Sequence, residues 1–190
     1  MPNNTKKYTF SGVSQHCLLV LLFLLLAITG FTQAKPMGDL STFIINIFGN
    51  LGNVIYIHRI LGIFYILFFL MHLIFITIHF LKGNRGLLIT KSDILSPKKE
   101  IEGRFKLRHK LDYYAVIIGS LVLIVSGLCL MFPTIAASVI NGNGVSVMRE
   151  IHFNEAIIAT GVIIFWHLFY AHCHPEVIPI DTKIFIPKKK

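Results

Sequence analysis

Four long apolar stretches, separated by polar segments, organise the chain. A helix needs about 20 apolar residues to cross the hydrocarbon core of a membrane, and each stretch approaches or exceeds that length. The stretches are roughly Gln15–Phe31, Ile55–Phe80, Tyr113–Phe132 and Ile151–Ala171. We therefore predict an all-α integral membrane protein. It is a four-helix bundle forming a single domain over residues 1–190, with spans at about 15–32, 54–81, 112–132 and 151–172.

The segments between the stretches carry turn and stop signals. The first stretch ends at Thr29-Gly30, and Gly49, Gly52 and Asn53 predict an irregular connection to the second. Phe132-Pro133 predicts the end of the third helix. The segment 82–111 is polar and basic, and we expect a surface loop there, whereas the proline-rich tail 173–190 is expected to be extended.

The first stretch has a second interpretation. Lys6 and Lys7, followed by the apolar run Leu18–Ile28 and a small residue at Ala34, also describe a secretory signal peptide. Cleavage would remove His16, which is a candidate ligand. We therefore favour a membrane span.

The charge distribution predicts the orientation of the chain. Hydrophobic residues make up 54%, mean hydropathy is +0.70, and 18 basic against 9 acidic residues give a net charge of +9. Four crossings would place 15 of the 18 basic residues on the side of both termini and the 82–111 loop, leaving Lys35, Arg59 and Arg149 opposite. The positive-inside rule puts that basic side in the cytoplasm. This sorting predicts a multi-pass membrane protein in contact with lipid, and argues against a nucleic-acid partner.

The cysteines indicate neither a disulfide framework nor a metal cluster. Cys17, Cys129 and Cys173 are odd in number and lie in or beside apolar stretches. No C-x-x-C-H sequence occurs, so a covalently attached c-type haem is not expected, and three thiols are too few for an iron–sulfur cluster.

Histidines carry the candidate chemistry. The chain has nine, and an ionisable residue inside a bilayer is a functional candidate unless it merely hydrogen-bonds a neighbouring helix. His152 and His167 lie 15 positions apart, so α-helical geometry separates them by about 22 Å and points them within about 60° of each other. One helix would thus offer one ligand in each leaflet.

Such a placement suits two b-type haems, each held by a pair of imidazoles on opposite sides of the ring. His58 is placed to face His152 at the outer level, and either His16 or His72 to face His167 at the inner level. Gly62, one turn after His58, would let a flat ring approach the helix. Arg59 and Arg149 flank the outer histidines and would suit haem propionates, or serve as interfacial anchors.

The chain resembles the cytochrome b, or gamma, subunit of membrane-bound formate dehydrogenase and the related di-haem cytochrome b subunits of respiratory hydrogenases and reductases. The resemblance covers nearly the whole chain. It is carried by His16 with Thr29-Gly30, by His58-Arg-Ile-Leu-Gly62, by Ser126-Gly127 through Pro133, and by Ile151-His152 with His167-Leu-Phe-Tyr170.

The resemblance implies a ligand set. The outer haem would take His58 and His152, and the inner haem His16 and His167. His72, 14 residues after His58, departs from the pattern, because helices two and four could then supply all four ligands, as in the cytochrome b of quinol-oxidising bc complexes. The family spacing favours His16, which leaves His72 as a core hydrogen-bonder or an edge contact of the inner haem.

The resemblance also implies a quinone, menaquinone or ubiquinone, beside the inner haem and just before the third helix. In this chain, His109 and Asp112 lie at that place. His109 would donate a hydrogen bond to a quinone oxygen and Asp112 would relay a proton. The alternative is that both are solvated interfacial residues. Electrons would pass between this quinone and an external iron–sulfur or multihaem cytochrome c subunit, in either direction. No motif for substrate chemistry of the chain's own occurs.

Two other classes of function compete with this hypothesis. The first is a haem-free membrane anchor or assembly subunit, in which the histidines bridge helices. The second is a transporter or channel with a histidine proton relay, against which we set the expectation that no acidic residue lies in an apolar core.

Overall fold

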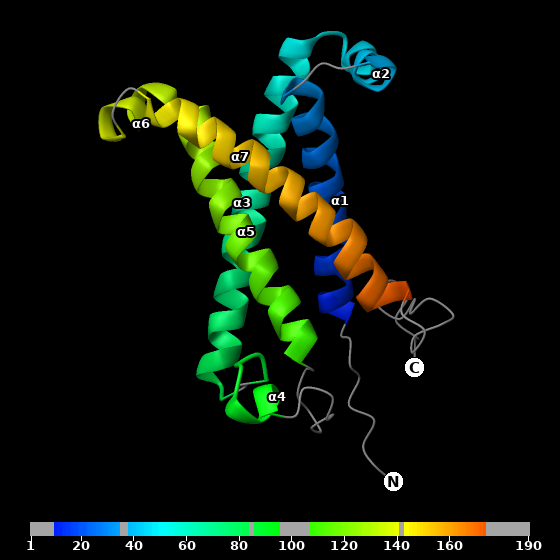
Figure 1. Cartoon of the computed structure of the whole chain (residues 1–190), viewed down its shortest axis with the longest axis vertical. Coiled ribbons are helices and arrows are strands. Elements are labelled where there is room, and N and C mark those ends of the chain that lie inside the picture. Colours follow the sequence, from blue (N-terminus) through cyan, green and yellow to red (C-terminus); the bar gives the residue numbers. More distant parts are fainter. Residues whose placement is uncertain (1–9, 35–37, 84–85, 96–106, 141–142, 174–190) are drawn as a thin grey trace. The chain divides into compact units, whose positions relative to one another are not determined.

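Every element of the described chain is helical. The computed structural model describes residues 10–34, 38–83, 86–95, 107–140 and 143–173 (Figure 1). The helices are α1 (Phe10–Ala34), α2 (Gly38–Phe48), α3 (Leu51–Leu81), α4 (Lys91–Leu95), α5 (Leu107–Met131), α6 (Pro133–Val139) and α7 (Gly144–Gly161), followed by a π-helix, η1 (Val162–Cys173). The predicted all-α class is confirmed for this part of the chain. The tail that we expect to be extended lies, beyond Cys173, outside the described residues.

Three helices are long and apolar enough to cross a membrane. They are Ser14–Ala34 within α1, the whole of α3 and the whole of α5. Many of their large apolar side chains are turned outward, and Leu21, Leu67 and Ile118 are each more than half exposed. Lipid accommodates such a surface, since a bilayer is itself apolar. The fourth expected span falls on α7 and η1, and the count of four crossings and the cytoplasmic placement of both termini stay predictions.

Small hydroxyl side chains occupy the interior. Thr29, Thr32, Ser120 and Ser126 are all buried, while many of the long apolar side chains face outward. Each of these hydroxyls donates to the carbonyl of the residue four positions earlier. Small residues let membrane helices approach closely, and this back-bonding satisfies the hydroxyl within its own helix.

The chain divides into two compact units. The first comprises residues up to Tyr65 together with those from Thr160 onward, and the second comprises Ile66–Ala159. Both α3 and the helical stretch 144–173 run without interruption from one unit into the other.

In the first unit, a helix replaces the irregular connection expected after α1. In α2, Ile44 is buried, whereas Leu40, Phe43 and Ile47 are exposed. The turn after α2 does follow the predicted glycine signal, because Gly49 adopts a φ of 88°, which residues with a side chain rarely adopt. The side-chain amide of Asn53 then donates to the carbonyl of Phe48 over 2.7 Å, which closes the turn into α3.

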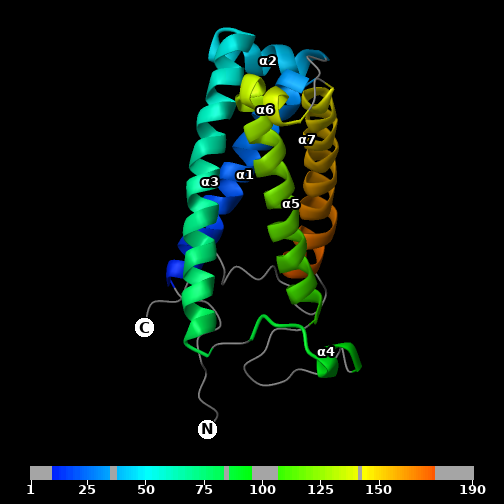
Figure 2. The same cartoon turned by 90° about the vertical axis from the view of Figure 1, so that its left-hand side faces the viewer.

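In the second unit, proline both ends one helix and begins the next. α5 ends at Met131, as the Phe132-Pro133 signal predicts, but α6 begins at once with Pro133 in its first turn. Proline fits there because its missing N–H would have no partner inside the helix. α7 likewise begins at Gly144, earlier than the expected Ile151. Figure 2 shows α4 at the same end of the unit as the start of α5.

The last helical stretch departs from the geometry assumed above. From Val162 the backbone is wound as a π-helix, with hydrogen bonds to the fifth residue along. The angle and rise predicted between His152 and His167 assumed α geometry throughout. They therefore do not apply to this stretch.

Candidate functional site

The first unit places a buried hydroxyl against His58. Thr29, near the end of α1, is 1% exposed, and its Oγ1 lies 2.9 Å from Nδ1 of His58 in the second turn of α3. The same hydroxyl donates to the carbonyl of Leu25 over 2.7 Å. The connection through α2 lets α3 return beside α1, so two residues 29 positions apart meet.

This geometry assigns the tautomer of His58. A carbonyl oxygen can only accept, so the single proton of the Thr29 hydroxyl is committed to Leu25. Oγ1 must then accept from the ring, which puts the ring proton on Nδ1. In the neutral form of this ring, the lone pair then lies on Nε2.

Gly30 provides the clearance for this ring. A Cβ added at Gly30 would lie 3.1 Å from Cε1 of His58, closer than ordinary van der Waals contact. Glycine is therefore the residue that lets the imidazole pack directly against the α1 backbone.

The second unit repeats the arrangement with different residues. Ser126 of α5 is 1% exposed, and its Oγ lies 2.9 Å from Nδ1 of His152 in α7 while donating to the carbonyl of Val122 over 2.6 Å. A Cβ added at Gly127 would lie 3.1 Å from Cε1 of His152. By the same reasoning, His152 carries a proton on Nδ1, and in its neutral form the lone pair lies on Nε2.

These two sites fit the axial ligands of a b-type haem. Haem iron is bound by the lone pair of a neutral imidazole nitrogen, and ligand histidines ordinarily donate their other ring N–H to a fixed acceptor. His58 and His152 both meet these requirements, and both are partly buried. The glycine beside each ring adds a close approach to the backbone that a side chain would block.

His72 has a different kind of environment. Its Nε2 lies 3.1 Å from the Tyr113 hydroxyl of α5, and its ring lies against Phe68 with centroids 6.4 Å apart. Both contacts are within the second unit. They support the role of core hydrogen-bonder that the sequence left open for His72.

The other two expected ligands belong to the first unit. His16 lies in α1, is partly buried, and has an Nε2 shielded from solvent. His167 lies in η1, and its side chain is outside the described residues.

The two arginines expected around the outer haem are more exposed than its expected ligands, His58 and His152. Arg59 and Arg149 are both exposed, as propionate partners or interfacial anchors would be. A Cβ added at Gly62 would meet no atom within 4 Å, so the side of α3 one turn after His58 is unobstructed there.

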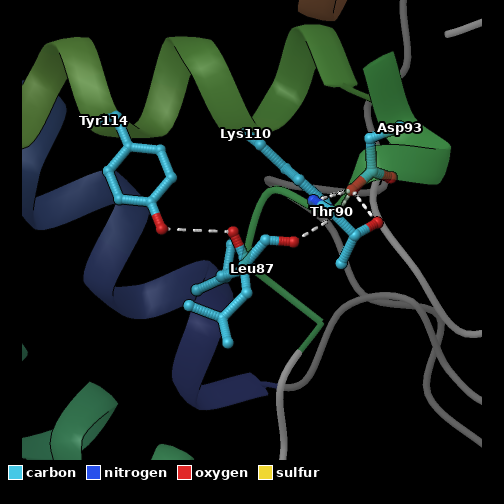
Figure 3. Close-up of polar contacts among 6 residues, drawn as sticks. Leu87, Thr90, Asp93, Lys110 and Tyr114 are labelled. Carbon is cyan, nitrogen blue, oxygen red and sulfur yellow. Dashed lines mark hydrogen bonds and ion pairs between the residues drawn. The ribbon is translucent and has the colours of Figure 1, made fainter. Parts of the chain in front are cut away.

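The start of α5 contains a buried ion pair that the sequence did not indicate. Lys110, which we expected in a solvated loop, is fully buried, and its Nζ donates to the Asp93 carboxylate over 2.9 Å and to the Leu88 carbonyl over 2.8 Å (Figure 3). Asp93 also accepts from the N–H and the hydroxyl of Thr90, both over 2.7 Å. These bonds from Lys110 and Thr90 hold the pKa of the Asp93 carboxyl far below its ordinary value.

The two residues expected at a quinone lie on the same end of α5. His109 accepts a 3.3 Å hydrogen bond from Nε of Arg108, and Oδ1 of Asp112 is buried. Lys110 lies between them in sequence, so the Asp93 contact holds the segment 86–95 beside this end of the helix. The hydroxyl of Tyr114 reinforces it with a 3.4 Å bond to the Leu87 carbonyl.

One expectation from the sequence was wrong. Glu155 lies within the fourth apolar stretch, and a Cβ added at Gly119 of α5 would be 2.7 Å from its Oε1. The carboxyl group of Glu155 therefore packs against the α5 backbone. Glu155 itself lies on α7, one turn after His152. An acidic residue does lie within an apolar stretch. A lack of acidic residues therefore cannot be used as an argument against a proton relay.

Apolar helices with imidazoles anchored through Nδ1 fit the class of membrane proteins that bind haem. The model of the family described as prokaryotic cytochrome b561 matches residues 8–181, and the chain belongs to this family. No curated protein and no solved structure gives a significant match. Family and fold together make the chain a multi-pass bacterial membrane cytochrome b of electron transport.

Sequence reasoning found the histidines and the glycines but missed what holds them. It read Thr29-Gly30 and Ser126-Gly127 as family markers and packing residues, without their hydroxyl contacts to His58 and His152. The available signal was the repetition itself. In each case a hydroxyl residue followed by glycine, on an apolar helix, precedes a histidine near the beginning of a later helix.

Proposed function

We propose that the chain is the di-haem b subunit of a respiratory oxidoreductase complex in the bacterial inner membrane. It would carry electrons between an external redox partner, an iron–sulfur protein or a multihaem cytochrome c, and the quinone pool. The observation that carries the proposal is the repeated anchoring of His58 and His152 through Nδ1, which leaves Nε2 as the ligating nitrogen in both units. Haem b supplies reversible one-electron transfer when bound.

The ligand assignment follows the sequence resemblance. His58 and His152 would ligate the outer haem, with Arg59 and Arg149 available to its propionates and Gly62 to its edge. His16 and His167 would ligate the inner haem. The hydrogen bond of His72 to Tyr113 supports this choice over the alternative in which His72 is the inner ligand.

The quinone, menaquinone or ubiquinone, is proposed at the cytoplasmic end of α5. His109 would donate to a quinone oxygen, and Asp112 would exchange protons with the cytoplasm. The ion pair of Lys110 with Asp93 supports this placement, because it holds the segment 86–95 against the end of α5 that carries His109 and Asp112. The positive-inside rule supports the cytoplasmic orientation.

The decisive experiment counts haems in the purified chain and in single-ligand variants. We expect two b-type haems per chain. His58→Ala and His152→Ala should each abolish the same spectral component, and His16→Ala and His167→Ala should abolish the other, whereas His72→Ala should retain both.

Two results would contradict the proposal. A purified chain without b-type absorbance would indicate a haem-free anchor. A single haem that survives the combined His152→Ala and His167→Ala substitutions would show that other residues ligate the iron.

A further inference from the structure

The two hydroxyl–histidine contacts share three measured features. The distance from Oγ to Nδ1 is 2.9 Å in both, the distance from the glycine Cβ position to Cε1 is 3.1 Å in both, and Thr29 and Ser126 are each 1% exposed. Each contact is made wholly within its own compact unit. Two separate pairs of helices have thus arrived at one local geometry.

The sequence does not require this likeness for packing. Thr32, one turn after Thr29, is 2% exposed and donates to the Ile28 carbonyl over 2.8 Å, so it fills the interior and satisfies its hydroxyl as Thr29 does. What distinguishes Thr29 is the second contact, to the imidazole. Packing alone would be served by any small residue at this position.

The acceptor role of these hydroxyls has an electronic consequence. Each hydroxyl oxygen accepts a hydrogen bond from Nδ1–H. This bond fixes the ring orientation and draws the proton partly away from the imidazole. The ring becomes a stronger electron donor through Nε2. A stronger donor stabilises ferric iron relative to ferrous iron and lowers the reduction potential.

We propose that Thr29 and Ser126 are positioning residues: each sets the reduction potential of the haem iron that its own histidine, His58 or His152, ligates, by holding that imidazole as the Nδ1–H tautomer. This inference rests on the proposed function for the assignment of those two histidines as ligands. It adds that the potential is controlled by a hydroxyl from the neighbouring helix, α1 or α5, in each unit.

The test uses the purified holoprotein and redox titration of the b-type absorbance. Thr29→Val keeps the shape of the side chain and removes the hydroxyl, and Ser126→Ala does the same for serine. We expect each variant to keep its haem and to raise the potential of one component. The expected change is on the order of tenfold in the ferric-to-ferrous ratio at fixed ambient potential, about 59 mV for one electron.

Conservative and matched variants separate tuning from packing. Thr29→Ser and Ser126→Thr retain a hydroxyl and should restore the original potential. Thr32→Val removes an equivalent buried hydroxyl without an imidazole contact and should leave the potential unchanged. The low-field g value of the ferric haem in electron paramagnetic resonance should move with Thr29→Val and not with Thr32→Val.

The outcomes distinguish this inference from the proposed function. If Thr29→Val and Ser126→Ala behave like Thr32→Val while His58→Ala still removes haem, the hydroxyls do not tune the iron and the inference is overturned. If His58→Ala leaves both haems in place, the ligand assignment itself has failed. Shifts of one shared component support the pairing of His58 with His152, and shifts of two different components overturn that pairing.

Discussion

The ammonium group of Lys110 lies 2.9 Å from the carboxylate of Asp93, across 17 positions of the chain. Lys110 is fully buried at the start of α5, and Asp93 lies in the five-residue helix α4. A buried ammonium group is tolerated when a carboxylate and a carbonyl accept its protons, as Asp93 and Leu88 do. The contact fixes the segment 86–95 to α5.

Removing either partner of this ion pair should loosen that segment. Asp93→Asn leaves the buried Lys110 ammonium without its counter-charge, and Lys110→Met leaves the Asp93 carboxylate without its cation. We expect each single variant to lower the melting temperature of the detergent-solubilised protein and to expose residues 86–95 to protease. The double variant should lose less than the sum of the two, because it removes both charges. Additive losses would show that the two side chains do not interact.

The pH dependence of the same segment follows from the depressed pKa of Asp93. The ordinary carboxyl value is 3.8 and the folded value is far lower, so the folded state favours the ionised carboxylate. Its stabilising contribution is complete above about pH 4 and is lost only as the pH falls below 3.8 toward the folded value. Protection of residues 86–95 from an acid-active protease should therefore persist at pH 4. In Asp93→Asn the segment should be equally open at pH 4 and pH 7. Loss of protection in the unsubstituted protein between pH 7 and pH 5 would contradict this prediction.

Alanine in place of Gly30 or Gly127 should weaken haem retention. The new Cβ would stand 3.1 Å from Cε1 of His58 or His152, so the imidazole must shift by a few tenths of an ångström. Misplaced ligand side chains commonly cost about tenfold in metal affinity. The haem-to-protein ratio after extended dialysis measures the effect. Gly161→Ala is the matched control, because its Cβ would meet nothing within 4 Å. Equal haem loss in all three variants would point to a general effect of alanine and not to the histidine contact.

Tyr113→Phe tests the role assigned to His72. The substitution deletes the hydroxyl that lies 3.1 Å from Nε2 of His72, and we expect it to lower the free energy of unfolding by about 1 kcal/mol. Both haem components should keep their absorbance and potential if His72 is a core hydrogen-bonder. A change in the inner component on Tyr113→Phe, or its loss on His72→Ala, would instead place His72 among the iron ligands.

Much of this architecture follows from the order of residues alone. Apolar runs of about 20 residues favour helices in a membrane, because a helix satisfies its backbone hydrogen bonds within a single segment. The all-α class and the spans on α1, α3 and α5 therefore needed only the hydropathy pattern. Histidines in or beside such runs were candidate ligands by the same reasoning, because an unpartnered ionisable group in lipid is costly.

The tertiary structure decided what lies across from each side chain. Lys110 looked like one more cation in a basic loop, and only the approach of α4 to α5 made it a buried partner of Asp93. Glu155 and Gly119 belong to different helices, so their contact depends on helix register, which hydropathy does not encode. The protonation of His58 and His152 is decided in the same way. It depends on hydroxyls 29 and 26 positions away, brought within 2.9 Å by the return of one helix along another.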